Sequence, residues 1–117
     1  MKVGIVGLGL MGGSMAKSIK ARTSHTVHGI DLDGETMALA RLCGAIDGPL
    51  NEETLPQCDL VLVAIRPQAA VDWVKTHAGQ ISKSAILVDL CGVKRTVVEQ
   101  ITPVAEEQGF AYIGGHP

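Results

Sequence analysis

The chain has 117 residues and a formal net charge of −2, with charges of both signs interspersed along it. This balance gives no electrostatic basis for binding nucleic acid or an anionic membrane, and no apolar run approaches the roughly 20 residues that span a bilayer. Hydrophobic residues make up 46% of the chain and aromatic residues only 3%, which is typical of a single α/β domain with an aliphatic core and helices on both faces of a parallel sheet.

The three cysteines, Cys43, Cys58 and Cys91, are odd in number and lack the spacing of a zinc site or a disulfide framework. We therefore expect no bound metal and a reducing, cytoplasmic location. The N-terminus also resembles a secretory signal peptide, but glycines recur through residues 4–13. They disfavour a signal helix, because each glycine costs about 1 kcal/mol in a helix relative to alanine.

A glycine-rich turn follows the first predicted strand, residues 3–6, and leads into a predicted helix at about 10–22. Its sequence is Gly7-Leu8-Gly9-Leu10-Met11-Gly12, and we predict that these six residues bind a dinucleotide. In such a turn Gly7 permits the tight bend, Gly9 lets the backbone approach a pyrophosphate, and Gly12 lets the helix pack close to the strand. The phosphates would lie at the helix N-terminus, where free N–H groups favour an anion. The turn alone is a weak signal.

An acidic residue strengthens this interpretation. A second strand, residues 26–30, ends at Asp31, and a carboxylate about 20 residues beyond the glycines accepts hydrogen bonds from the adenosine ribose. It also repels a 2′-phosphate, and no arginine follows in Asp31-Leu32-Asp33, so NAD is favoured over NADP. The alternative is that Asp31 or Asp33 only caps the next helix, for which Asp33 is better placed.

The first two helices carry apolar residues at helical spacing. The first helix repeats Met11, Met15, Ser18 and Ile19, and the second, at about 34–43, offers Met37, Ala40 and Leu42 before a stop at Gly44. Residues 45–46 are expected to form a short edge strand, and residues 47–49 a turn. Asn51 can cap a one-turn helix over residues 52–55.

The most hydrophobic strand, residues 59–65, is predicted to be central and to lie beside the first strand. The crevice at the carboxyl ends of these two strands is where ligands bind in such sheets, so we assign Ala64, Ile65 and Arg66 to the cofactor site. Arg66 is equally compatible with a solvated loop charge. A helix over residues 67–77 follows, with Ala70, Val71 and Val74 facing inward, and Trp73 and His77 are interpreted as helix surface or partial core.

The remaining chain is predicted to form a strand over residues 85–88, a helix over about 95–108 that is kinked or restarted at Thr102-Pro103, and a strand over 111–113. It ends in Gly114-Gly115-His116-Pro117. His116 is either a loop residue without a role or a general base, because an imidazole with a pKa near 6.5 accepts a proton near neutral pH.

Five segments together resemble the N-terminal nucleotide domain of the prephenate and arogenate dehydrogenase family. They are GLGLMGGS at 7–14, the strand ending in Asp31, DLVLVAIRP at 59–67, VDLCGVK at 88–94 and YIGGHP at 112–117. The resemblance implies a single Rossmann-type, doubly wound domain over residues 1–117 that binds NAD. It also implies oxidative decarboxylation of prephenate or arogenate on the route to tyrosine, with hydride transfer to the nicotinamide.

The resemblance also implies roles for individual residues. His116 matches the catalytic histidine, and Lys94 matches a lysine that orders the loop beside the nicotinamide or the substrate. Many relatives have a serine two residues before this lysine, where this chain has Gly92 after Cys91. The serine role does not transfer, so backbone N–H groups of Cys91 and Gly92, or a water, would replace it, and Cys91 is counted with the cofactor site. A thiol nucleophile is not expected.

In the family, a second, all-helical domain follows, dimerises and completes the substrate site. This chain lacks that domain, so we expect it to bind NAD without turnover, and the complete protein to be a homodimer. Two alternatives remain open. The hydroxyisobutyrate-type dehydrogenases share the glycine turn but have an Asp-x-Ser-Thr pattern after the fourth strand. A non-catalytic module that senses NAD would fit the size and would not need His116.

Overall fold

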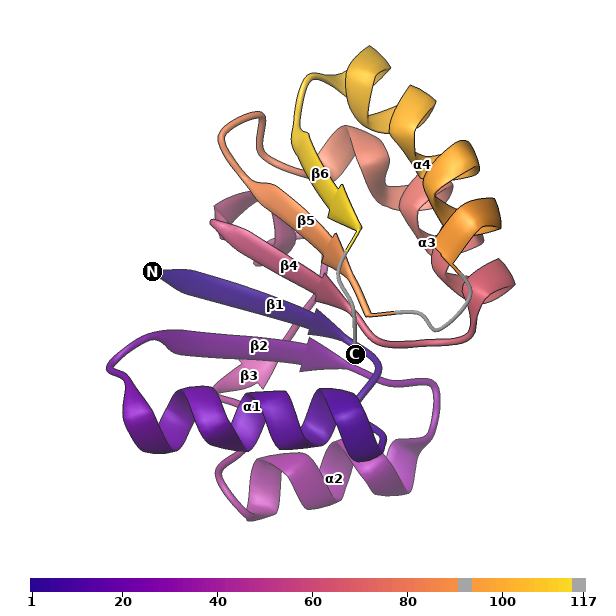
Figure 1. Ribbon diagram of the computed structural model, residues 1–117. Helices are drawn as coiled ribbons and strands as arrows, with labels where there is room; N and C mark the ends of the chain where they lie inside the picture. The colour runs from indigo at the N-terminus through magenta and orange to yellow at the C-terminus, as the bar shows by residue number, and fades with distance from the viewer. Residues whose placement is uncertain (91–93, 115–117) are drawn as a thin grey trace.

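A six-stranded parallel sheet forms the centre of the molecule in the computed structural model, which describes residues 1–90 and 94–114 (Figure 1). The strands are β1 (Lys2–Val6), β2 (Thr26–Ile30), β3 (Gly48–Pro49), β4 (Leu60–Val63), β5 (Ile86–Asp89) and β6 (Ala111–Gly114). Their order is β3-β2-β1-β4-β5-β6, and every neighbouring pair is parallel. This order confirms the predicted Rossmann-type, doubly wound α/β fold.

Helices cover both faces of the sheet. They are α1 (Leu10–Arg22), α2 (Gly34–Leu42), α3 (Pro67–His77) and α4 (Lys94–Gln108), with short 3-10 turns at Leu55–Gln57 and Ala78–Gln80. Figure 1 shows α1 and α2 on one side of the sheet and α3 and α4 on the other. The chain winds one way from β1 to β2 and the other way from β1 to β4, so β1 marks the point where the direction of winding reverses.

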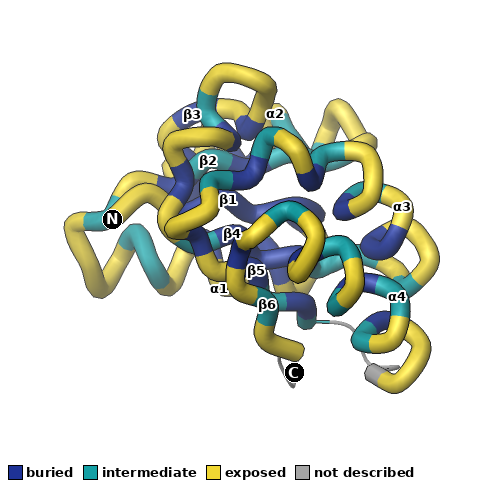
Figure 2. Tube along the Cα trace, turned by 90° about the horizontal axis from the view of Figure 1, so that it is seen from above, coloured by how far each residue is buried: buried dark blue, intermediate teal, exposed yellow. Residues whose placement is uncertain are grey.

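Each face of the sheet has its own aliphatic core, and Figure 2 shows the buried strands enclosed by exposed helix surfaces. On one face, α3 and α4 pack Val74 and Ile101 against strand residues such as Val61. On the other, Ala16 and Ala40 pack against Val3, Ile5 and Val27. The strands are apolar because both of their faces are covered, as the composition predicts.

The inward face of α1 differs from the predicted one. Gly12 and Ala16 are buried and Ile19 packs against the core, whereas Met11 and Met15 are 41% and 36% exposed. The spacing of apolar residues predicted that the methionines face inward. Small residues face the sheet instead, and they let α1 approach it closely. On α2, Ala40 is buried and Met37 packs beside it as predicted, but Leu42 is 86% exposed.

The edge strand also lies elsewhere than predicted. Residues 45–46 are buried but form no strand, and the strand is Gly48–Pro49, which was expected to be a turn. The Leu50 N–H donates to the carbonyl oxygen of Gly29 at 2.8 Å, which extends the pairing with β2. Pro49 is tolerated because an edge strand uses the N–H groups of only one side. Asn51 accepts hydrogen bonds from the N–H groups of Glu53 and Thr54 as a cap would, but the predicted one-turn helix over residues 52–55 is a turn, and a 3-10 helix follows it at Leu55–Gln57.

The second half of the chain follows the prediction more closely. α3 has the predicted bounds, with Ala70, Val71 and Val74 buried, and β4 lies beside β1 although it ends at Val63. α4 is not restarted at Pro103 but continues through it. Proline removes one backbone hydrogen bond, and the packing of buried Val97, Ile101 and Ala105 holds both halves of the helix on the sheet. In the part of the chain that the structure describes, no helix is long and apolar enough to cross a bilayer.

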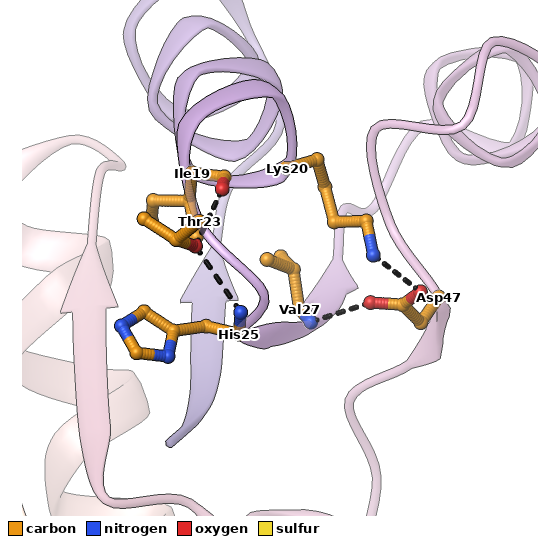
Figure 3. A network of polar contacts seen from close by, with 6 residues as sticks. All are labelled: Ile19, Lys20, Thr23, His25, Val27 and Asp47. Carbon is orange, nitrogen blue, oxygen red and sulfur yellow. Dashed lines mark hydrogen bonds and ion pairs between the residues drawn. The ribbon is translucent and has the colours of Figure 1, made fainter.

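Asp47 links α1, β2 and the segment before β3 at the end of the sheet opposite the glycine turn (Figure 3). Its carboxylate accepts from Lys20 Nζ at 2.8 Å and from the Val27 N–H at 2.7 Å. The hydrogen bond from Lys20, assisted by the bond from Val27, lowers the pKa of Asp47 below its ordinary value of 3.8, although desolvation opposes the shift. The charged form of Asp47 is therefore favoured in the folded protein, and it stabilises the fold at pH values above 3.8.

We predict that Asp47→Asn lowers the free energy of unfolding at pH 7 by about 1 kcal/mol, because an amide cannot replace both acceptor oxygens. The difference between variant and wild type should shrink as the pH falls below 3.8 and Asp47 becomes protonated. Urea unfolding at pH 7 and pH 3 measures it. Lys20→Met, which keeps the Val27 bond, should cost less than Asp47→Asn, and an equal or larger cost would contradict this account.

Candidate functional site

The turn after β1 can be built only from glycine at two positions. Gly7 has a φ of +93°, and its N–H donates to the carbonyl oxygen of Ile30 at 2.8 Å. A Cβ on Gly7 would lie 2.5 Å from the carbonyl oxygen of Ala64, and a Cβ on Gly12 would lie 1.7 Å from that of Gly7. The beginning of α1 therefore packs directly on the turn, with no room for a methyl group.

Gly9 has a different environment. It is exposed and is the N-cap of α1, and no described atom lies within 4 Å of a Cβ built on it. Within the described chain, no side chain caps this helix and its first turn carries no acidic residue. The first-turn N–H groups of α1 therefore face an open space with a favourable field for an anion, as a pyrophosphate site requires.

A cleft with a volume of 710 Å³ opens beside this turn, at the carboxyl ends of β1, β2 and β4. It is lined by Val6, Gly7, Gly9, Ile30, Asp31, Leu32, Ala64, Ile65, Arg66, Ala69, Asp72, Trp73 and Thr76. Six residues assigned to the cofactor from sequence therefore share one cleft, namely Gly7, Gly9, Asp31, Ala64, Ile65 and Arg66. The cleft lies at the point where the winding of the sheet reverses, as expected for a ligand site in such folds.

The other four residues of the turn do not line this cleft. Leu8 is 5% exposed and packs in the core, and buried Gly12 serves the contact with Gly7. Leu10, which is 95% exposed, lines with Leu8 and Gly9 a second groove of 440 Å³ between α1 and α2, and Met11 is also exposed. Any contact of these four with a cofactor in the cleft would use backbone N–H groups rather than side chains.

Asp31 is tied to the backbone on both sides. Its Oδ2 accepts from the Leu8 N–H at 2.7 Å and its Oδ1 from the Asp33 N–H at 2.9 Å. Asp33 caps α2 as predicted, accepting from the N–H of Glu35 and the hydroxyl of Thr36. Each oxygen of Asp31 has a further lone pair, so the half-buried carboxylate can still accept bonds from a diol.

Two features near the cleft were not predicted from the sequence. Trp73 lines it, whereas sequence indicated only helix surface or partial core. Asp89, at the end of β5, is fully buried and accepts a hydrogen bond of 2.5 Å from the Tyr112 hydroxyl on β6. A carboxylate at the end of an apolar strand was visible in the sequence, but its partner depends on the pairing of β5 with β6.

The structure describes only some of the residues to which the resemblance gives a role in catalysis or cofactor binding. Lys94 is the first residue of α4, close in sequence to the end of β5. Cys91, Gly92 and His116 lie outside the described residues. Their roles stay predictions.

Comparison with known proteins identifies the family. The sequence profile described as "Prephenate dehydrogenase, nucleotide-binding domain" matches residues 15–117. The chain belongs to the prephenate dehydrogenase family. It is 29% identical over 119 aligned residues to a prephenate dehydrogenase of Lactococcus lactis subsp. cremoris, covering 99% of this chain and 33% of the relative. The chain thus spans about a third of the length of that relative.

Solved structures agree with this assignment. A prephenate dehydrogenase from A. aeolicus, in complex with hydroxyphenyl propionate and NAD+, is 28% identical and superposes with a TM-score of 0.85 over 100% of this chain and 41% of its own. An arogenate dehydrogenase from Synechocystis is 27% identical with a TM-score of 0.86 and the same coverage. The chain is therefore the nucleotide-binding domain of a family of NAD-dependent oxidoreductases.

Gly9→Ala and Gly12→Ala form a matched pair that separates binding from packing. We predict that Gly12→Ala lowers the free energy of unfolding by at least about 3 kcal/mol, because its methyl group would overlap the Gly7 carbonyl. Gly9→Ala should cost only about 1 kcal/mol of stability, because alanine is a poorer N-cap than glycine, but it should weaken NAD binding about tenfold, because the methyl group faces the anion site. Thermal unfolding and calorimetric titration measure the two effects. Equal behaviour of the two variants would contradict this division.

Proposed function

We propose that this domain binds NAD in the 710 Å³ cleft and serves a prephenate or arogenate dehydrogenase. The observation that carries the proposal is a hydrogen bond of 2.7 Å from the Leu8 N–H to Asp31 Oδ2, which joins the glycine turn to the end of β2. This bond brings an uncapped helix N-terminus and a carboxylate into one cleft, and these two features together would suit a dinucleotide.

The residues of the cleft fit the parts of the cofactor. The space around Gly9 suits the pyrophosphate, and the N–H groups of the first turn of α1 would donate to it. Asp31 would accept hydrogen bonds from the adenosine ribose and repel a 2′-phosphate, which favours NAD over NADP. Exposed Arg66 is near enough to the cleft to interact with a phosphate or with the adenine.

The proposed reaction is oxidative decarboxylation. Bound NAD would accept the hydride that leaves the ring carbon bearing the hydroxyl. His116 would take the hydroxyl proton, as a neutral imidazole can near pH 7, while carbon dioxide leaves and the ring becomes aromatic. Lys94 would order the loop beside the nicotinamide or the substrate. Backbone N–H groups of Cys91 and Gly92 would replace the serine that many relatives carry.

We propose that turnover requires a second domain in addition to this one. The curated relative is about three times as long, and closure of a second domain over the cleft would assemble the substrate site. We therefore propose that the 117 residues bind NAD without turnover, and that the complete protein is a cytoplasmic homodimer acting on prephenate or arogenate.

Calorimetric titration of the chain with NAD and with NADP tests the proposal. NAD should bind more tightly than NADP, and Asp31→Ala should abolish the difference because the repelling carboxylate is gone. Asp33→Ala is the matched control, since it removes only the cap of α2 and should keep the preference for NAD. Absence of binding of either nucleotide to the folded wild-type chain would refute the proposal.

A further inference from the structure

Trp73 is held in one orientation on α3. Its indole stacks on the imidazole of His77, with ring centroids 4.5 Å apart and an angle of 23° between the planes. His77 Nδ1–H donates to the carbonyl oxygen of Trp73 at 2.8 Å, which fixes the imidazole beneath the indole. Both residues are half-buried, so the indole is a rigid aromatic surface that is still partly accessible.

This surface belongs to the cofactor cleft. From α3, the cleft is lined by Ala69, Asp72, Trp73 and Thr76, which recur at helical spacing. Leu32, which follows Asp31 directly, lines the same cleft with a fully exposed side chain. Besides the polar backbone of the glycine turn, the cleft therefore offers an aliphatic side chain and an indole.

We propose that Trp73 is the aromatic wall against which the adenine of the dinucleotide packs, an inference that rests on the NAD binding proposed above. Asp31 fixes the ribose, and the base is bonded directly to that ribose, so it must lie within one ring's length of the carboxylate. The side towards Gly9 is taken by the pyrophosphate. The base therefore extends the other way, where the indole offers a flat surface for stacking.

A second cavity, of 520 Å³, supports this direction. It shares Ile30 and Trp73 with the cleft, so the indole borders both spaces. Glu52 and Glu53 line this second cavity, and their carboxylates would repel a pyrophosphate. The neutral adenine can lie beside these carboxylates, whereas the anionic pyrophosphate cannot. Trp73 thus helps to set which way the dinucleotide lies in the cleft.

Trp73 is the only tryptophan of the chain, so its fluorescence reports on this contact directly. Titration of the 117-residue wild-type chain with ADP-ribose, which keeps the adenosine half, should quench the emission as the base stacks on the indole. Nicotinamide mononucleotide, which keeps the other half, should leave the emission unchanged. A response to nicotinamide mononucleotide alone, or none to saturating ADP-ribose, would overturn the proposal.

Variants give an independent test. Trp73→Leu, which keeps apolar bulk without an aromatic face, should weaken ADP-ribose binding about tenfold by calorimetry, and Trp73→Phe should recover part of the loss. Lys75→Ala, exposed on the same helix and lining neither cavity, is the matched control and should bind as the wild type does. Thermal unfolding verifies that each variant is folded. The fluorescence titration uses the wild-type chain, so it stays a valid test even if a variant does not fold.

The outcomes separate this inference from the proposed function. If NAD binds to Trp73→Leu as tightly as to the wild type, while Asp31→Ala still loses the preference for NAD, the aromatic wall is refuted and the proposed function stands. If the wild-type chain binds neither NAD nor ADP-ribose, both are refuted. Weaker binding in Trp73→Leu together with quenching by ADP-ribose supports the two proposals at once.

Discussion

The close contact between the start of α1 and the end of β1 is the constraint on which the rest of the structure depends. Only glycine fits at Gly7, where φ is +93° and a methyl group would meet Ala64, and only glycine fits at Gly12, which lies against the Gly7 carbonyl. This contact aims the N-terminus of α1 at the reversal point of the sheet. A longer side chain at either position would move the helix away from the cleft that it helps to form.

Asp31 joins the second strand to that turn. One carboxylate holds the Leu8 and Asp33 N–H groups, so the same group organises the site and remains able to accept bonds from a ribose. Folding and the proposed ribose binding therefore depend on one residue. This explains why Asp33→Ala, which affects only the cap of α2, is a more informative control than a substitution distant from the cleft.

Features encoded locally could be predicted from the sequence, and features that depend on distant contacts could not. The glycine spacing, the apolar strands and Pro67 at the start of α3 identified the fold, most helix bounds and six residues of the cleft. The predicted inward face of α1 was wrong because apolar periodicity favours Met15 over small Ala16, which is the buried residue. That Trp73 lines the cleft follows from the packing of α3 on the sheet, which brings Trp73 to the same cleft as Ile30 and Asp31. The Asp89–Tyr112 bond follows from the pairing of β5 with β6.

A titration with NAD followed by amide chemical shifts would show whether the glycine turn and Asp31 form one cofactor cleft. We predict shifts at Gly7, Gly9 and Asp31 and at residues 64–66, all saturating at the same NAD concentration. Little change is expected at Cys43, in the groove between α1 and α2. Shifts at Cys43 without shifts at Asp31 and residues 64–66, or none at Gly9, would contradict a single cleft built from the turn and Asp31.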